Sequence, residues 1–346
     1  MPGLTAAIPS LDDLRRRTQE VFGRTPCLWQ LQVSMALLKR DKDVICISAM
    51  GSGKTLTFWM PLLFCNDGIQ IIISPLNILG TQNVNELAAV GIPAIAITAD
   101  TATYQNFKVI LDLTYPRNFN DRKQDIADLR YCVIVTNIEL LMKDGGGLEK
   151  LWKISTFTAH IVSIIWDEAH CVSHWGDFRP EYRDAGRLRY LLPGGIVFYL
   201  TSATLPPRVL DDVKKILQVS RSYMFHRSND RPNVYLMVRE LKYPQNSFFN
   251  IAFLIPDGWH LGCPPPPKFL IFFDNIAESI EAIKFLRSRL PFTHQNNIKW
   301  FNADMSAQFR EAETDALKAS SIWGLGCTDS FGMVSPLLLV AAGPHS

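Results

Sequence analysis

The sequence predicts an α/β protein made of two lobes, each built on a parallel sheet. From residue 43 onward, short apolar runs rich in Val and Ile alternate with helical patterns, which is typical of parallel strands buried on both faces. The alternation weakens around residue 240 and restarts after four consecutive prolines, Pro264–Pro267. A chain of 346 residues with 47% hydrophobic residues is long and apolar enough for two packed domains.

The first lobe is expected to begin with two helices and to continue with six strands. Residues 11–22 form an amphipathic pattern that Gly23 closes, and residues 28–38 form a second helical pattern. The apolar runs that follow are separated by further helical patterns, so their strands should share one sheet. We expect strands at 44–47, 70–73, 94–97, 131–135, 161–166 and 196–200, and helices at 54–64 and 79–90.

A shorter α/β pattern forms the predicted second lobe. The interval before it has little periodicity and is expected to be a linker or an exposed loop. The predicted division of the chain is therefore 1–240, 241–267 and 268–346. In the last part we expect strands at 269–273, 299–301 and 323–328, and helices at 276–290 and 307–319.

Composition excludes several classes of protein. The formal net charge is +2, so a polyanionic partner would have to be held by a local groove of Lys and Arg. The seven cysteines contain no C-x-x-C pair, and neither a disulfide framework nor a zinc site is expected. Arg15–Arg17 occupy the place of a signal peptide's apolar stretch, and the apolar run 337–342 is far shorter than the ~20 residues of a membrane span. We expect a soluble intracellular protein with no membrane partner.

The segment from Ser48 to Thr55, S-A-M-G-S-G-K-T, has the pattern of a phosphate-binding turn. Glycines at 51 and 53 let the backbone approach phosphates closely, Lys54 supplies a positive charge, and the Thr55 hydroxyl can ligate Mg²⁺. The alternative is a chance glycine-rich turn. A predicted strand before the turn and a predicted helix after it favour the phosphate site.

Asp167 and Glu168 directly follow the apolar strand pattern at 161–166. A carboxylate pair in this position is the second feature that nucleotide hydrolysis requires. In nucleotide hydrolysis, one carboxylate holds Mg²⁺ and the other orients or deprotonates the attacking water. Those are the roles expected of Asp167 and Glu168, respectively. The alternative is an ordinary surface pair of carboxylates, but apolar parallel strands end at the edge of the sheet where ligands bind.

Taken together, the glycine turn and the D-E-A-H box resemble superfamily-two helicases of the DEAH-box type, and further segments resemble the RecQ DNA helicases. The resemblance implies two RecA-like lobes that bind ATP. The matching segments are Phe22–Gly23 with Trp29–Gln30, the S-P-L box 74–76, the aromatic loop 171–182, the T-S-A-T box 201–204 and the run R-S-N-D-R-P-N at 227–233.

The resemblance assigns roles around the nucleotide. Gln30 would read adenine in the N-terminal segment, although Cys27 stands where RecQ proteins usually carry Arg. Lys54, Asp167 and Glu168 would be catalytic, with Thr55 and Asp167 as Mg²⁺ ligands. The implied ATP-binding residues are Gln30, Met50, Gly51, Ser52, Gly53, Lys54 and Thr55, and the implied coupling residues are His170, Ser202 and Thr204.

The aromatic loop suggests contacts to single-stranded DNA. Trp175 and Phe178 offer flat faces on which bases can stack, at ~1–3 kcal/mol per base. Arg179 can pair with a phosphate or stack on a base. The alternative is that both aromatic side chains are simply buried. The implied DNA-binding residues are Ser74, Pro75, Trp175, Phe178, Arg179, Asn302 and Thr328.

The second lobe departs from the family near its end. Cys327–Met333 resembles the opening of motif V, but residues 334–346 form an atypical tail, and motif VI with its arginine finger is absent from the sequence. The expected second lobe is therefore incomplete. The resemblance implies a nuclear 3′-to-5′ DNA helicase core that uses ATP and Mg²⁺ on single-stranded or tailed duplex DNA. The alternatives are a truncated ATP- and DNA-binding fragment that does not unwind, and a P-loop ATPase of metabolic or signalling type.

Overall fold

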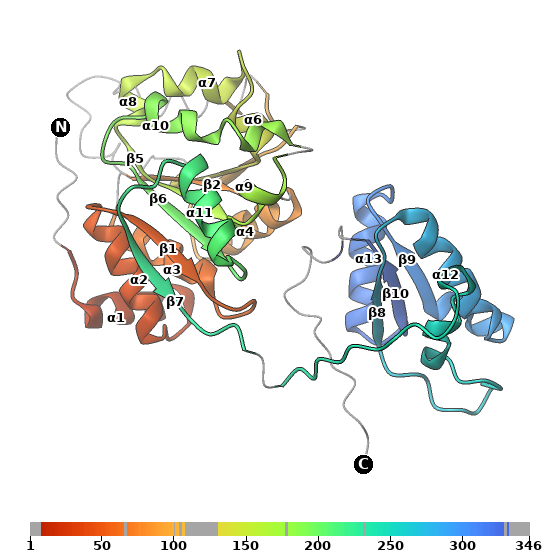
Figure 1. Ribbon diagram of the computed structural model, residues 1–346. Helices are drawn as coiled ribbons and strands as arrows, with labels where there is room; N and C mark the ends of the chain where they lie inside the picture. The colour runs from red at the N-terminus through yellow and green to blue at the C-terminus, as the bar shows by residue number, and fades with distance from the viewer. Residues whose placement is uncertain are drawn as a thin grey trace. The chain divides into compact units, whose positions relative to one another are not determined.

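The chain folds into two units. The computed structural model describes residues 8–65, 68–75, 77–99, 101–103, 106–107, 131–176, 179–230, 233–328 and 331. Contacts divide the chain into Met1–Asp230 and Arg231–Ser346, a boundary that lies earlier than the predicted residue 240. Each unit is built on its own parallel sheet, so the predicted α/β class is confirmed (Figure 1).

The first unit is built on a seven-stranded sheet in which every described pairing is parallel. Its order is β3-β4-β2-β5-β6-β1-β7. Several strands that are adjacent in the sheet are not consecutive in the sequence, so the chain crosses over the sheet to connect them. The strands are β1 (Asp43–Ile47), β2 (Ile69–Ile73), β3 (Ala94–Ile97), β4 (Val133–Thr136), β5 (Ile161–Asp167), β6 (Val197–Ser202) and β7 (Ser222–His226).

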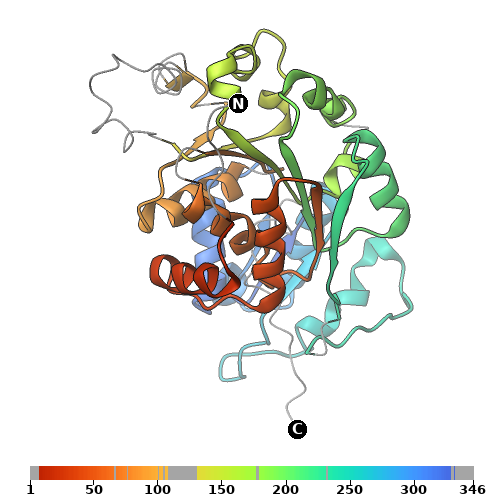
Figure 2. The same cartoon turned by 90° about the vertical axis from the view of Figure 1, so that its left-hand side faces the viewer.

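Helices cover both faces of this sheet (Figures 1 and 2). On one face, Val44 and Cys46 of β1 pack with helices α2 to α4. On the other face, Ile45 and Ile47 pack with the helices that follow β4, β5 and β6. Side chains alternate between the faces of a strand, so a strand covered on both faces must be apolar throughout.

The helices of the first unit vary in length. None of the helices in the described part of the chain is long and apolar enough to cross a membrane. The helices are α1 (Leu11–Phe22), α2 (Leu28–Lys39), α3 (Lys54–Trp59), α4 (Asn77–Ala89), α6 (Ile138–Leu141), α7 (Gly147–Trp152), α8 (Ser155–Thr158), α9 (Cys171–His174), α10 (Leu188–Leu191) and α11 (Pro207–Ile216), with 3-10 turns η1 (Met60–Phe64), η3 (Pro180–Tyr182) and η4 (Ala185–Arg187).

Local chemistry accounts for several element boundaries. Ser10 caps α1 by accepting a hydrogen bond from the Asp13 N–H, and Gly23 ends the helix with a left-handed φ of 63°. The helix predicted at 54–64 changes to 3-10 geometry at Met60, where Pro61 supplies no N–H for an α-helical bond. Strand β7 was not predicted, because this edge strand is only partly buried and its apolar run, 223–225, is only three residues long.

The second unit has a three-stranded parallel sheet in the order β8-β10-β9. Gly326 of β10 lets α12 pack closely, because a Cβ there would lie 2.6 Å from Cγ1 of Ile283. The interval 241–267, predicted as a linker, carries two 3-10 turns and adds the buried Ile255 to the core of this unit. The elements are β8 (Phe269–Phe272), β9 (Ile298–Phe301), β10 (Gly324–Cys327), α12 (Ile276–Ser288), α13 (Ala307–Lys318), η5 (Gln245–Ser247), η6 (Phe249–Leu254) and η7 (Phe292–Asn297).

Candidate nucleotide site

Three of the predicted motifs meet at one edge of the first sheet. Strands β5, β6 and β1 are neighbours, and their register places Asp167 beside Thr201 and Ile47 beside Ser202. The glycine turn leaves β1, the acidic box ends β5, and the T-S-A-T box ends β6. Because parallel strands all finish at the same edge, the fold brings these segments together although they are far apart in the sequence.

The glycine turn is a compact loop that its own side chains stabilise. Gly51 and Gly53 have φ values of 74° and 82°, a left-handed geometry that glycine adopts without strain. The Ser48 hydroxyl donates to Oγ of Ser52 at 2.8 Å. Lys54 Nζ donates to the carbonyl oxygens of Ser48 at 3.0 Å and Ala49 at 3.3 Å. The ammonium group of Lys54 therefore lies against the loop and close to its backbone.

Gln30 of α2 braces this loop. Its Nε2 donates to the carbonyl oxygens of Gly53 at 3.0 Å and Ser52 at 3.3 Å, and its Oε1 accepts from the Cys27 N–H at 2.7 Å. A Cβ at position 53 would lie 2.6 Å from Nε2 of Gln30. Gly53 is thus needed both for its φ and for this close approach. Adenine reading by Gln30 stays a prediction, since both ends of its amide have partners within the chain.

The acidic box carries two carboxylates in different electrostatic states. Burial and the negative charge of Glu168 raise the pKa of Asp167 to about 7. Burial opposes ionisation of Glu168 as well, but its hydrogen bond with His170 and the positive charge of Lys54 lower the pKa of Glu168 overall. Glu168 also has a left-handed φ of 49°, a strained geometry for a residue with a side chain.

The predicted coupling residues form one network with Glu168. His170 Nδ1 lies 2.8 Å from Oγ of Ser202 and 3.3 Å from Oε2 of Glu168. The Ser202 hydroxyl donates to the same carboxylate oxygen at 3.4 Å and accepts from the Thr204 N–H at 3.1 Å. Any displacement of the T-S-A-T box therefore reaches Glu168 through Ser202.

Two contacts at this edge were not predicted. The side-chain amide of Asn229 donates to the carbonyl oxygen of Ala203, which ties the R-S-N-D-R-P-N run to the T-S-A-T box. The hydroxyl groups of Tyr199 and Thr57 lie 2.7 Å apart in the core and join β6 to α3. A tyrosine inside an apolar run was the available signal for the second contact, because a buried phenol usually has a hydrogen-bond partner.

The aromatic loop and the S-P-L box are joined by Arg179. Its NH1 donates to the carbonyl oxygen of Pro75 at 3.1 Å, and its Nε lies 3.2 Å from Oε1 of Glu139. The guanidinium carbon lies 4.6 Å from the ring centre of Trp175, which is half-buried against the core. Arg179 is therefore held by three groups at once. Phe178 lies outside the described residues, so its predicted role is not addressed.

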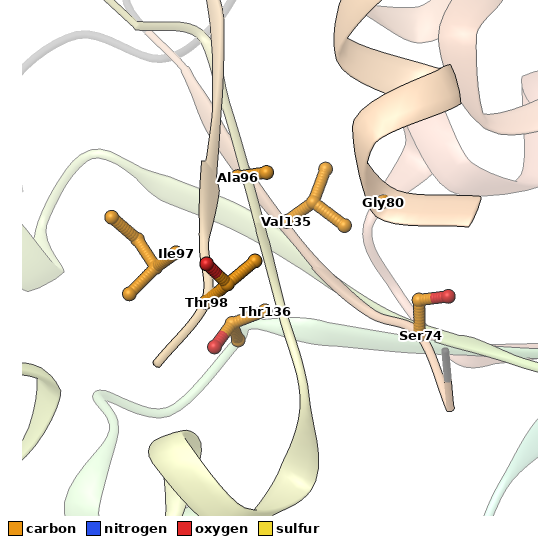
Figure 3. Close-up of a pocket in the computed structure, with 7 residues that line it drawn as sticks. All are labelled: Ser74, Gly80, Ala96, Ile97, Thr98, Val135 and Thr136. Carbon is orange, nitrogen blue, oxygen red and sulfur yellow. The ribbon is translucent and has the colours of Figure 1, made fainter. Parts of the chain in front are cut away.

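The DNA contact predicted for Ser74 stays a prediction. Ser74 is buried, and its N–H donates to the Thr136 carbonyl oxygen at 2.9 Å. Figure 3 shows Ser74 at a small cavity whose volume is about 10 Å³, enough for one water molecule. The other residues that line the cavity are Gly80, Ala96, Ile97, Thr98, Val135 and Thr136.

The two DNA contacts predicted in the second unit follow neighbouring strands. Asn302 follows β9 and Thr328 follows β10, and the two strands are paired. The Asn302 side chain is buried and accepts from the Asp304 N–H at 3.1 Å, so it shapes the turn after β9. The Thr328 N–H donates to the Phe301 carbonyl oxygen at 3.3 Å. Direct DNA contacts by these residues stay predictions.

Known proteins share this sequence pattern and this fold. The family model described as DEAD/DEAH box helicase matches residues 28–213. The ATP-dependent DNA helicase Q1 of Rattus norvegicus is 32% identical over 228 residues, which are 65% of this chain and 34% of that protein. The ATP-dependent DNA helicase RecQ of Haemophilus influenzae is 28% identical over 294 residues, which are 84% of this chain and 42% of that protein.

Solved structures match across both units. The DUF1998 helicase MrfA bound to DNA and AMPPNP has a TM-score of 0.63 at 14% identity, over 93% of this chain and 44% of that one. Dbp5 of S. cerevisiae bound to RNA and ADP BeF3 has a TM-score of 0.58 at 18% identity, over 92% of this chain and 76% of that one. At such identities the likeness concerns the fold.

The match to the family model spans more than half of the chain and includes the glycine turn, the acidic box and the T-S-A-T box. The chain covers about a third of the length of its rat relative. The chain therefore belongs to the DEAD/DEAH box helicase family, and within that family it is similar to the RecQ DNA helicases.

Proposed function

We propose that this chain is the core of a RecQ-like DNA helicase that couples ATP hydrolysis to movement along single-stranded DNA. The observation that carries the proposal is the meeting of Lys54, Glu168 and Ser202 at the carboxyl ends of three neighbouring strands. Lys54 is suited to binding phosphate, Glu168 to orienting water, and Ser202 to transmitting movement. A P-loop ATPase without DNA chemistry would not need the Trp175–Arg179 loop directly after its acidic box.

The proposed ATP site is centred on the glycine turn. Lys54 now donates to two backbone carbonyl oxygens, and phosphate oxygens are stronger acceptors for an ammonium group than neutral carbonyls. When ATP binds, Lys54 therefore exchanges these partners for phosphate. Gly51 and Gly53 offer backbone N–H groups to the same phosphates, and the Ser52 N–H, which donates to the Ala49 carbonyl oxygen at 3.2 Å, would exchange that partner as Lys54 does. Met50 and Gln30 lie at the border of the site.

The residues present fit a Mg²⁺ ion that arrives with ATP. Burial and the charge of Glu168 make a negative charge on Asp167 unfavourable, and this is why the pKa of Asp167 is raised. A cation beside Asp167 would offset that negative charge. Among the described residues no group of three or more His, Cys, Asp or Glu side chains could hold a metal. Mg²⁺ needs only one or two protein ligands beside phosphates and water, and Asp167 with Thr55 would supply them. When bound, the ion neutralises charge on the phosphates.

Glu168 is the proposed acceptor for the attacking water. Its lowered pKa keeps it ionised near neutral pH, so it can orient the water and accept its proton. The hydrogen bond from Ser202 and the contact with His170 hold the carboxylate in place. Because Ser202 also accepts from the Thr204 N–H, the state of the nucleotide can bias the T-S-A-T box.

The proposed partner is single-stranded DNA or a tailed duplex. The rat relative is named a DNA helicase, and the MrfA structure holds DNA, which supports a nucleic-acid role for this fold. Trp175 and Arg179 are the proposed link between DNA and Glu168, since α9 connects their loop directly to the acidic box. In a eukaryotic cell this substrate would place the chain in the nucleus.

The test is strand separation of a duplex that carries a 3′ single-stranded tail, with ATP and Mg²⁺. We expect separation by the parent chain, no separation by Lys54→Ala, and weaker activity on a duplex with a 5′ tail. DNA-stimulated ATP turnover without separation would favour a chain that binds and hydrolyses but does not unwind. Equal ATP turnover by the parent and Lys54→Ala would overturn the assignment of the site.

A further inference from the structure

The second unit displays a run of four prolines, Pro264–Pro267, in the loop that leads into β8 (Figure 1). None of the proposed steps in ATP or DNA binding uses this loop. Proline fixes φ near −65°, and a residue that precedes proline is pushed toward an extended ψ. Pro264, Pro265 and Pro266 meet both conditions, and the described residues contain no cis peptide bond. Both restraints favour the left-handed polyproline II conformation for this run.

Both ends of the run are fixed to the second unit. At its start, the Trp259 indole N–H donates to the Pro264 carbonyl oxygen at 3.1 Å. The Trp259 ring packs on Trp323, with ring centres 5.1 Å apart. At its end, the Phe269 N–H donates to the Trp323 carbonyl oxygen at 3.0 Å as β8 begins. The same tryptophan, Trp323, thus contacts the chain on both sides of the run, through Trp259 before it and Phe269 after it.

The exposure of the run follows the three-residue period of polyproline II. Pro266 is half-buried, whereas Pro264, Pro265 and Pro267 are exposed. Positions three apart lie on the same ridge of such a helix, so Pro264 and Pro267 form one outward ridge and Pro265 lies on a second. The ridge of Pro266 faces the protein. Leu261, three residues before the run, has an exposed fraction of 70%.

We propose that Pro264–Pro267 is a docking ligand for a partner protein domain whose aromatic-lined groove reads polyproline II helices. Such grooves accept the two outward ridges of a preformed helix, and the proline run itself loses little conformational entropy on binding because its backbone is restrained. Proline has no N–H, so the run cannot pair as an added strand with a second copy of the chain. It also carries no charge, which excludes it as a phosphate-binding surface for nucleic acid.

The experiment titrates the full chain with three purified probes, an EVH1, a WW and an SH3 domain, in separate binding measurements. At least one probe should bind the parent chain saturably. The double variant Pro264→Ala/Pro267→Ala removes the outward ridge and should weaken that binding about ten-fold or more, because each missing ring leaves a pocket of the groove unfilled. Pro266→Ala changes the inward ridge and should weaken it less.

Pro244→Ala is the matched control, because Pro244 is exposed in the same unit but lies outside the run. It should bind each probe as the parent does. The double variant should also keep the parent's DNA-stimulated ATP turnover, which separates this proposal from the helicase proposal. Absence of binding by all three probes, equal losses in Pro244→Ala, or a larger loss in Pro266→Ala than in the double variant would each overturn it.

Discussion

The two units build the same kind of parallel sheet but place different chemistry at its carboxyl edge. In the first unit, Lys54, Asp167 and Glu168 gather there, and the charge of Lys54 acts on the pKa of both carboxylates. In the second unit, the described part of the corresponding edge carries Asn302 and Thr328, with Asp274 and Asp304 in the turns after β8 and β9. The proposed catalytic residues therefore all lie in the first unit, and the proposed role of the second is binding.

The units also differ in how their strands are covered. Strands β2 and β6 of the first unit are buried at every position. In the second unit only β10 is fully buried, and β8 is partly exposed along its length. A sheet covered on both faces supports a strained residue such as Glu168, because surrounding packing offsets the cost of its left-handed φ.

The largest expected effect is a loss of ATP turnover, and it tests whether the first unit carries the proposed catalytic carboxylate. Glu168→Gln keeps the shape of the side chain and one acceptor oxygen for Ser202, but it removes the negative charge and cannot accept a proton from water. We expect ATP turnover to fall by about 10²–10⁴-fold while ATP binding stays close to that of the parent. Single-turnover hydrolysis and a nucleotide-binding titration measure the two quantities. Glu149→Gln, on the surface of α7, is the control and should change neither. Turnover retained in Glu168→Gln would assign the water to another group.

The next effect tests the second unit. Phe301 is fully buried in the second sheet and packs edge-on against Phe331, with ring centres 4.8 Å apart. Phe301→Ala should lower the free energy of unfolding of that unit by about 3–5 kcal/mol. Calorimetry should show the loss in one transition and leave nucleotide binding by the first unit unchanged. Phe292→Ala, at an 87% exposed position of the same unit, should leave the transition in place. A single transition that moves as a whole would show that the units unfold together.

Lys54→Ala separates phosphate binding from packing. The ammonium group donates to two carbonyl oxygens of the loop backbone, so its loss should cost about 10²–10³-fold in ATP turnover and leave the melting temperature nearly unchanged. Lys150→Ala, an exposed lysine of α7, should behave as the parent in both measurements. A large fall in melting temperature without loss of turnover would reverse the roles assigned to the loop.

The smallest effect concerns the link between DNA and hydrolysis. Arg179→Lys keeps the charge but loses the planar group that meets Pro75, Glu139 and Trp175 together. DNA stimulation of ATP turnover should fall by roughly five- to ten-fold, about 1–1.4 kcal/mol, with basal turnover preserved. Trp175→Ala should act in the same direction. The control is Arg208→Lys at an exposed position of α11. Unchanged stimulation in both variants would make the aromatic loop purely structural.

The sequence determined the strands and the catalytic segments because their physical causes are local. Continuous runs of Val and Ile predict parallel strands that are buried on both faces of the sheet, as in β1, β2 and β5. Gly51 and Gly53 predict a turn with a backbone geometry that only glycine adopts easily, and Lys54 follows Gly53 directly. The edge strand β7 and the 3-10 turn η1 were not predicted, because the first has an apolar run of only three residues and the second depends on the local geometry around Pro61.

Only the tertiary structure decided which distant groups touch. Local pattern could not foresee that Gln30 spans 23 residues to brace Gly53, or that Arg179 joins the aromatic loop to Pro75 across 104 residues. Nor could it show that the Asn302 side chain is buried in its own turn. These outcomes depend on strand order, which places β5, β6 and β1 side by side and is set by how the crossover helices pack on the two faces of the sheet.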